Sequence, residues 1–548
     1  MTGILQRRPW LAVSLLMIIA LLAAACGQAA PEPAAPSDSG SGGAATEPAA
    51  DEGPFKVVVA QAADAASWDP PQDWNTAPEW LISNAYDCLL FKSPDSGSFE
   101  PKLATSWEQI DDLTFRVHLR EGVKFHDGTE LTAEDVKFHY ERIAEGPREL
   151  YIVTDQYKFF DEIVIHDDYT FDFVTPAPDS LLLQKLSQTA CGIVSKDYVE
   201  EVGPDGVHRE PMGTGAYKLV EWVRGEHVTF EANEDWWGGK PDVDEFEFRI
   251  IEEASTRVAE LLTGGVDLTY GILPQDEDRL NAKDNLSTVW SPTDRGYQLY
   301  TRIEVHPDYV GDPELDREFA TFDPRVREAI ELAIDKYALR DIAGGEGEAF
   351  RARLFKPLPE AHPDLYGPQA NLYDPDRARA ILQEAGYGDG EPTLVFHASA
   401  AWPGEDIALA VGDMLEQVGF NVDLRILDTT TFNQEIYFPR RTQELVLLGL
   451  GGQMNPFFAL FSFRCVQTAG NYGYCNEELD PLIESAWEEV HDDARRYEMY
   501  QEASYIIAED RPVIGLFQTS QLWGINDRIE YTPRTDNHIF GAEIKRAR

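Results

Sequence analysis

The side chains that most often carry out catalysis or hold a metal are thinly spread in this chain. It has 11 histidines and 5 cysteines among 548 residues. His118, His126 and His139 do not follow a spacing that would place them on one metal, and no C-x-x-C pair occurs. The G-x-S-x-G, H-E-x-x-H and P-loop motifs are also absent from the sequence. We therefore expect no metal, no cofactor and no enzymatic activity, with a secreted hydrolase as the remote alternative.

The N-terminal segment has the features of an export signal. Arg7 and Arg8 precede the apolar run 10–25, which has the length of a signal-peptide core and is short for a membrane span. Residues 21–26 (LLAAAC) resemble the lipobox of bacterial lipoproteins, although Ala23 stands where that motif prefers leucine. We expect residues 1–25 to be removed and the thiol of Cys26 to be lipidated, with an ordinary cleaved signal as the alternative.

Residues 26–54 are almost all Ala, Pro, Gly, Ser, Thr, Glu and Asp. Such a composition has too few apolar side chains to build a core. We expect this stretch to be a disordered tether between a lipid anchor in the membrane and a folded body outside the cytoplasm.

The other four cysteines suggest disulfide bonds, because an exported chain folds in an oxidising compartment. Cys465 and Cys475 are the pair that we favour, since they enclose a short loop rich in glycine, asparagine and tyrosine. Whether Cys88 pairs with Cys191 is left open by the sequence.

The charge of the chain excludes one class of partner. It has 46 basic and 97 acidic residues, a formal net charge of -51. Such a field repels the phosphates of nucleic acids and the headgroups of anionic lipids. We expect no nucleic-acid partner, membrane contact only through the lipid at Cys26, and a monomer.

The body alternates between strand and helix patterns, which is typical of an α/β protein. Residues 113–119 alternate in polarity, and Thr132-Ala133-Glu134-Asp135 has the form of a capping box at the start of a helix. Asp323-Pro324 opens a further predicted helix that runs to Gly344-Gly345. Apolar spacing predicts helices over 375–385 and 407–418 and a strand over 420–426. Helix-then-strand units of this kind build a partly parallel sheet.

Several segments in a fixed order resemble one protein family. They are residues 103–108 (LATSWE), 119–128 (LREGVKFHDG), 131–136 (LTAEDV), 213–217 (GTGAY), 233–241 (NEDWWGGKP), 323–335 (DPRVREAIELAID) and 471–482. Together they are similar to family 5 of the bacterial extracytoplasmic solute-binding proteins, which includes the oligopeptide, dipeptide and nickel binders of ABC importers. The similarity extends from about residue 55 to 520. The side chains of 125–128 and the pair Trp236-Trp237 we interpret as structural.

This resemblance implies a two-lobed periplasmic-binding-protein-like fold with a hinge. Lobe I would cover 55–295 with an inserted subdomain at about 99–210, lobe II 296–517, and 518–548 would return to lobe I. The crossings between the lobes would fall near 290–300 and 510–520. The importer would recognise the form in which the lobes have closed on a ligand.

The resemblance also suggests where a ligand lies. Peptide-binding relatives carry an aspartate four residues before a proline, and here the corresponding segment, 448–456, has Gly452 at that position. No acid lies between Leu445 and Pro456 to pair with a peptide's ammonium group. Our candidate ligand-binding residues are Gly449, Gly451, Gly452, Gln453 and Asn455 of this segment, Ser399 and Trp402 of a loop after a strand, and Trp68.

The function predicted is that of a receptor that captures a small solute and delivers it to an ABC importer. A peptide is the ligand that the family favours, and an oligosaccharide or another neutral polar solute is the alternative because of Gly452. A ligand sensor that signals through a membrane partner would use the same body.

Overall fold

The computed structural model describes residues 53–548 except 73–75, 95, 148–156, 188, 306–308, 355–357, 359, 389, 402, 442, 452–455 and 466–473. The predicted signal segment, the tether and Cys26 lie outside these residues. Within the described part of the chain, no helix combines the length and the apolar character needed to cross a membrane.

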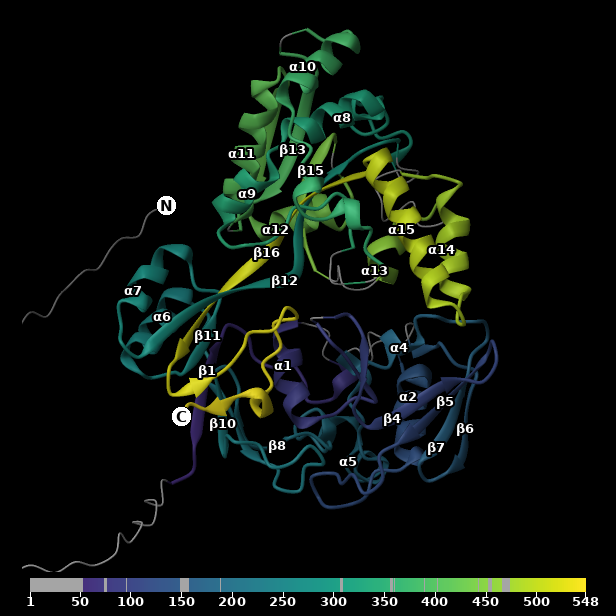
Figure 1. Cartoon of the computed structure of the whole chain (residues 1–548), viewed down its shortest axis with the longest axis vertical. Coiled ribbons are helices and arrows are strands. Elements are labelled where there is room, and N and C mark those ends of the chain that lie inside the picture. The colour runs from purple at the N-terminus through teal and green to yellow at the C-terminus, as the bar shows by residue number, and fades with distance from the viewer. Residues whose placement is uncertain are drawn as a thin grey trace, which may run out of the picture. The chain divides into compact units, whose positions relative to one another are not determined.

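One ten-stranded sheet extends through the body (Figure 1). In spatial order its strands are β14 (Asn421–Leu427), β13 (Thr393–Ser399), β15 (Leu445–Leu450), β12 (Leu286–Thr301), β16 (Val513–Asn526), β11 (Leu268–Tyr270), β1 (Lys56–Gln61), β10 (Glu245–Ile250), β9 (His227–Ala232) and β8 (Tyr217–Val223). β13 pairs in parallel with β14 and β15, and β1 pairs in parallel with β10 and β11. Each half of the sheet therefore contains parallel strands, while β8, β9 and β10 at one end are antiparallel.

Two long antiparallel strands, β12 and β16, join the two halves of this sheet. Their pairing runs from Leu286 opposite Asn526 to Tyr300 opposite Val513, with irregular register between Pro292 and Gly296. The first half of the pair borders β11, and the second half borders β15. Figure 1 shows these strands, teal and yellow, lying side by side between the two halves. The sheet bends or slips most easily where register changes, so a hinge is expected at this point.

Helices cover the half of the sheet that contains β13, β14 and β15. They are α8 (Pro324–Ala333), α9 (Lys336–Ala343), α10 (Pro375–Glu384), α11 (Gly404–Gln417), α12 (Thr429–Thr431), a π-helix (Phe432–Tyr437), α13 (Pro456–Phe461), α14 (Leu479–Glu488) and α15 (Asp493–Asp510). Their apolar faces form two buried clusters, one of which packs α8, α10 and α11 against β13 and β15.

The predicted single helix from Pro324 to Gly344 is wrong in one respect. The structure has two helices, α8 and α9, separated at Ile334 and Asp335. The carboxylate of Asp335 accepts hydrogen bonds from the backbone N–H groups of Tyr337 and Ala338, at 3.2 and 3.3 Å. Asp335 is thus an N-cap, and a capping aspartate inside an apolar helical pattern starts a new helix.

The half of the sheet that contains β1 packs against α1 (Thr76–Ala85), α5 (Lys196–Val207), α6 (Ala254–Thr263) and α7 (Glu277–Asn281). A separate four-stranded sheet is inserted in the chain between α1 and α5. Its strands, in spatial order, are β4 (Ala104–Gln109), β5 (Thr114–Leu119), β7 (Thr170–Val174) and β6 (Glu162–Asp167). It has its own core with α2 (Ala133–Glu145) and α4 (Leu182–Lys185). Two short hairpin pairs, β2 (Leu90–Lys92) with β3 (Phe99–Pro101) and β17 (Ile529–Glu530) with β18 (Lys545–Arg546), complete the strands.

Local signals placed several elements correctly. α2 begins at Ala133, directly after Thr132, whose backbone N–H donates to the carboxylate of Asp135 at 3.0 Å. α10 begins at Pro375 after the N-cap Asp374, and α11 and β14 follow each other as the periodicity predicted.

Candidate functional site

The carboxyl ends of β13 and β15 lie beside the middle of the β12–β16 pair, where its register is irregular. β13 and β15 are parallel, so their ends lie at one edge of the sheet, where open α/β sheets bind ligands. Ser399 is the last residue of β13, while Gly449 lies near the end of β15 and Gly451 just after it. The structure thus brings three of the predicted ligand-binding residues to one edge.

Tyr297 of β12 closes this edge from the side of the hinge. It pairs with Gly449, and a Cβ atom on that glycine would lie 3.2 Å from Cζ of the Tyr297 ring. The Tyr297 ring also stacks on Phe517 of β16, with ring centroids 5.7 Å apart. Burial raises the pKa of Tyr297 to about 12, so the phenol is neutral and can both donate and accept a hydrogen bond.

Arg295 brings a positive charge to the same edge. It is exposed, and its Nη1 atom would lie 3.1 Å from a Cβ atom on Gly451. No described carboxylate forms an ion pair with Arg295. A guanidinium group of this kind can hold a carboxylate through two parallel hydrogen bonds.

Ser399 faces the start of α12, which follows β14. Its hydroxyl lies 3.1 Å from Oγ1 of Thr429 and accepts a hydrogen bond from the backbone N–H of Ala401. The backbone oxygen of Ser399 would be 3.0 Å from a Cβ atom on Gly404, the first residue of α11. A side chain at 404 would be crowded against this oxygen, so glycine suits the tight turn from β13 into α11.

A cavity of about 450 Å³ lies between the inserted sheet and the helices that follow β15. Its lining includes Lys92, Trp107 and Leu182 from one side and Glu360, Pro456 and Arg496 from the other. Residues of the insert also contact α14 directly: the backbone N–H of Ser180 donates to the carbonyl of Trp487, and the Trp487 indole donates to Asp179, both at 2.9 Å. Segments far apart in the sequence therefore enclose one volume.

Of the remaining predicted ligand-binding residues, four lie outside the described part of the chain and one is buried elsewhere. The four are Trp402, Gly452, Gln453 and Asn455. Trp68 has no exposed surface, and its ring packs edge-on against Trp222 and Phe230, each with a centroid distance of 5.7 Å. The structure therefore gives Trp68 a packing role instead of the open aromatic face that we predicted, because β8 and β9 cover it.

The buried carboxylate of Asp87 connects two of the segments that carry the family resemblance, one of which contains the Trp236-Trp237 pair that we interpreted as structural. It accepts hydrogen bonds from the indole N–H groups of Trp236 and Trp237, at 3.2 and 2.8 Å, and from the hydroxyl of Thr214 at 3.2 Å. Lys102 forms an ion pair with it at 3.2 Å. These donors satisfy the buried charge and tie the segments 213–217 and 233–241 to the strand–helix corner at 85–90.

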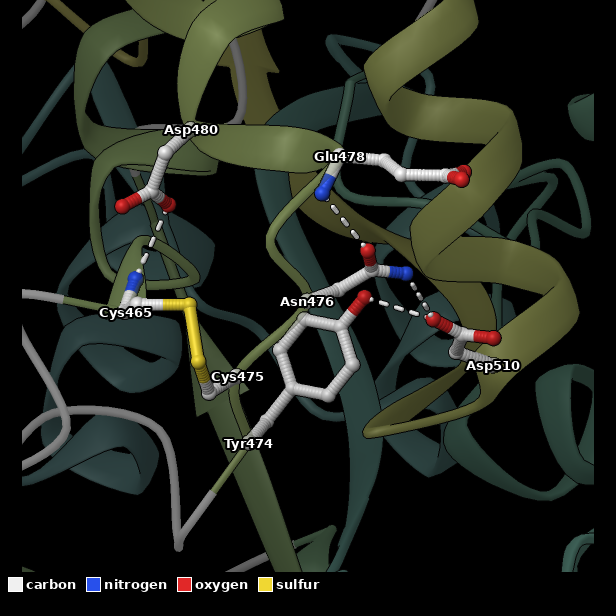
Figure 2. Close-up of a disulfide and its surroundings, with 7 residues drawn as sticks. All are labelled: Cys465, Tyr474, Cys475, Asn476, Glu478, Asp480 and Asp510. Atoms are coloured by element: carbon white, nitrogen blue, oxygen red, sulfur yellow. Dashed lines mark hydrogen bonds between the residues drawn. A yellow bond between two sulfur atoms is a disulfide. The ribbon is translucent and has the colours of Figure 1, made fainter.

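Both disulfides are present. Cys465 and Cys475 are joined, and Cys88 is joined to Cys191. Figure 2 shows the first bridge beside Asp510, whose carboxylate accepts hydrogen bonds from the Tyr474 hydroxyl and the Asn476 amide, each at 2.8 Å. The backbone N–H of Cys465 donates to Asp480 at 2.9 Å. The bridge thus joins the segment that follows α13 to the segment that precedes α14.

Sequence reasoning missed Arg295, Tyr297 and Glu360. Tyr297 and Arg295 lie in the segment predicted to cross between the lobes, and a crossing segment must border a ligand, so that position was the available signal. Nothing in the local sequence around Glu360 distinguishes it from other acidic residues.

Comparison with known proteins identifies relatives over most of this chain. The family model described as bacterial extracellular solute-binding proteins, family 5, matches residues 98–468. The dipeptide-binding protein of Escherichia coli (strain K12) is 26% identical over 445 residues, which cover 76% of this chain and 80% of that protein. The glutathione-binding protein GsiB of Pectobacterium atrosepticum is 28% identical over 488 residues, which cover 86% of this chain and 90% of that protein.

Solved structures share the fold. A dipeptide-binding protein from Pseudoalteromonas sp. SM9913, in complex with Met-Leu, aligns with a TM-score of 0.70 and 22% identity over 90% of this chain and 100% of its own. HbpA2 from Haemophilus parasuis aligns with a TM-score of 0.75 and 21% identity over 90% of this chain and 99% of its own. The predicted α/β, two-lobed fold is thereby confirmed.

Proposed function

Because the chain belongs to the bacterial extracellular solute-binding proteins of family 5, we propose that it captures a peptide outside the cytoplasm and delivers it to an ABC importer. Its curated relatives are binding proteins and not enzymes. They are named for the binding of dipeptides and glutathione, both of which are small peptides.

One observation carries this proposal. The two halves of the main sheet share only the strands β12 and β16 as connections within it, and a cavity is lined from both the insert and the helices beyond β15. A ligand that contacts both sides stabilises the form in which they are close, by as much as its affinity for the two forms differs. We propose lobe I at 55–295, lobe II at 296–517 and the return of the chain at 518–548.

The edge formed by β13 and β15 supports a peptide in particular. Arg295, which has no ion-pair partner among the described residues, offers a guanidinium group for a ligand carboxylate, and Tyr297 offers a neutral hydroxyl beside it. The absence of side chains at Gly449 and Gly451 lets Tyr297 and Arg295 lie directly against the end of β15. We also propose that the receptor is a monomer held to the membrane by a lipid on Cys26.

Mass spectrometry of the ligand released on denaturation tests this function. The chain would be purified under native conditions, and the released fraction compared with that from chain first unfolded and refolded without ligand. A set of short peptides is the expected result, together with a smaller radius of gyration by X-ray scattering when peptides are returned. Release of a sugar, or no binding of any peptide from a random pool, would refute the proposal.

A further inference from the structure

Glu360 is a half-buried acid, and one of its carboxylate oxygens is buried without a hydrogen-bond partner. Its Oε2 atom is buried and accepts no hydrogen bond, and the residue lines the cavity between the insert and the helices beyond β15. A buried carboxylate oxygen left unsatisfied is unfavourable, most of all when the group is charged. The site therefore calls for a group that donates hydrogen bonds, and preferably one that carries positive charge.

Other acids at this cavity already have partners. The carboxylate of Asp179 accepts a hydrogen bond from the Trp487 indole at 2.9 Å and also pairs with Lys185. Asp493 pairs with Arg496 at 2.7 Å. Of the four acids in the described lining, Glu108, Asp179, Glu360 and Asp493, Glu360 alone has an oxygen that is both buried and unsatisfied.

Lys92, the cation of the opposite wall, is engaged elsewhere. Its ammonium group donates to the side-chain oxygen of Gln184 at 2.6 Å and lies 5.4 Å from the centroid of the Phe99 ring. Burial raises the pKa of Glu360, and the charge of Lys92 opposes that effect. Arg496, which also lines the cavity, lowers the pKa of Glu360 as Lys92 does, and a cation of the ligand would favour the ionised carboxylate further.

The rest of the lining suits a small cationic group. Phe99, Trp107, Phe115 and Tyr497 surround the same volume, and aromatic faces attract ammonium and guanidinium groups. A volume of about 450 Å³ is within the range of small-ligand sites, and an organic cation with a few attached groups fits it.

We propose that Glu360 binds the positively charged group of the ligand, an ammonium or guanidinium, inside this cavity. The proposal rests on the peptide function proposed above and identifies the acid that recognises the peptide. It answers the absence of any Asp or Glu between Leu445 and Pro456, because the negative charge comes from a different segment. The charged group belongs either to the N-terminus of the peptide or to a lysine or arginine side chain.

The test compares three forms of the full chain: wild type, Glu360→Gln and Glu498→Gln. Glutamine keeps the shape of Glu360 and removes its charge. Glu498 is exposed on α15, the helix that supplies Arg496, and is outside the lining, so its variant controls for loss of one charge nearby. Each protein is stripped of ligand and incubated with a random pool of di- to pentapeptides, either unblocked or acetylated at every N-terminus. Mass spectrometry then measures the peptides that remain bound after gel filtration.

We expect Glu360→Gln to retain peptides with roughly ten- to hundredfold lower affinity, the effect of one charge-assisted hydrogen bond, and Glu498→Gln to match wild type. Loss of binding on acetylation would assign the cation to the N-terminus. Retention of only those acetylated peptides that contain lysine or arginine would assign it to a side chain. Both results support the proposal.

Equal peptide retention by Glu360→Gln and wild type would overturn the role of Glu360 and leave the peptide function intact. A wild-type chain that retains no peptide from either pool would instead refute the peptide function. If Glu360→Gln does not fold, the unblocked and acetylated pools still test on wild type whether the bound ligand must carry a cation. Retention of acetylated peptides without lysine or arginine, as tight as that of unblocked ones, would overturn the cation site.

Discussion

Replacing Glu331 by glutamine should destabilise the fold more than any other single charge removal in α8. The carboxylate of Glu331 accepts hydrogen bonds from Arg351 at 2.8 and 3.1 Å and from Arg511 at 2.7 Å, and the Lys336 ammonium lies 3.4 Å away. The side chains of Glu331 and Lys336 are 2% and 0% exposed. Arg511 connects α15 to β16, so this cluster fixes the helical layer to a strand that crosses the hinge.

The expected loss of unfolding free energy follows from leaving Lys336, Arg351 and Arg511 without the anion that they share. Removal of one partner from a buried ion pair costs about 3–5 kcal/mol. The pKa of Glu331 agrees: burial raises it, but Lys336 and Arg351 outweigh burial and hold it at about 2, below the ordinary value of 4.5. That difference corresponds to about 3 kcal/mol of stability when the group is ionised in both states.

The pH dependence has a definite sign. A carboxylate whose folded pKa is lowered contributes its full stability above its unfolded pKa and loses it as the pH falls towards the folded value. The free-energy difference between wild type and Glu331→Gln should therefore be largest above pH 4.5 and shrink between pH 4.5 and 2.

The assay is urea unfolding followed by tryptophan fluorescence at pH 7 and again at pH 3. Glu328→Gln, half-buried on the same helix, is the matched control, and we expect its unfolding free energy to stay within about 1 kcal/mol of wild type. Lys336→Met should have a smaller effect than Glu331→Gln. Burial lowers the pKa of Lys336 to about 8, so the cost of removing its charge from water offsets part of what its ion pair contributes to stability. A Glu331→Gln protein as stable as wild type at pH 7, or one whose deficit is the same at pH 3, would refute this reasoning.

Three further changes test the site and its supports. Arg295→Gln should weaken the binding of peptides with a free carboxylate by about ten- to hundredfold and leave peptide amides unaffected, as measured by calorimetry; equal losses for both would contradict a contact with the carboxylate. Trp487→Phe removes the hydrogen bond to Asp179 and should destabilise the closed form by about 1 kcal/mol. We expect a several-fold weaker ligand affinity and a larger radius of gyration without ligand. An unchanged affinity would show that this contact does not select the closed form. Replacing both Cys465 and Cys475 by serine should lower the unfolding free energy by about 2–3 kcal/mol, since the bridge closes a loop with a sequence separation of 10; no loss under oxidising conditions would count against it.

Much of the fold could be predicted from interactions between residues that are close together in the sequence. The N-caps at Thr132, Asp323 and Asp374 and the 3.6-residue apolar spacing behind them marked where helices begin. These signals depend on residues a few positions apart and therefore survive without knowledge of the tertiary structure. The same locality produced the error at Asp335, where one apolar pattern continued through a second cap.

The sequence by itself determined the family, the α/β class and the edge of the sheet at which Ser399, Gly449 and Gly451 lie, because motif order and strand direction are properties of the chain. Only the tertiary structure decided that Trp68 is enclosed by two strands and that Glu360 meets the insert across a cavity. The physical reason is distance along the chain. Glu360 and Lys92 are separated by more than 250 residues. A local sequence pattern therefore cannot predict that these two charged side chains line the same cavity.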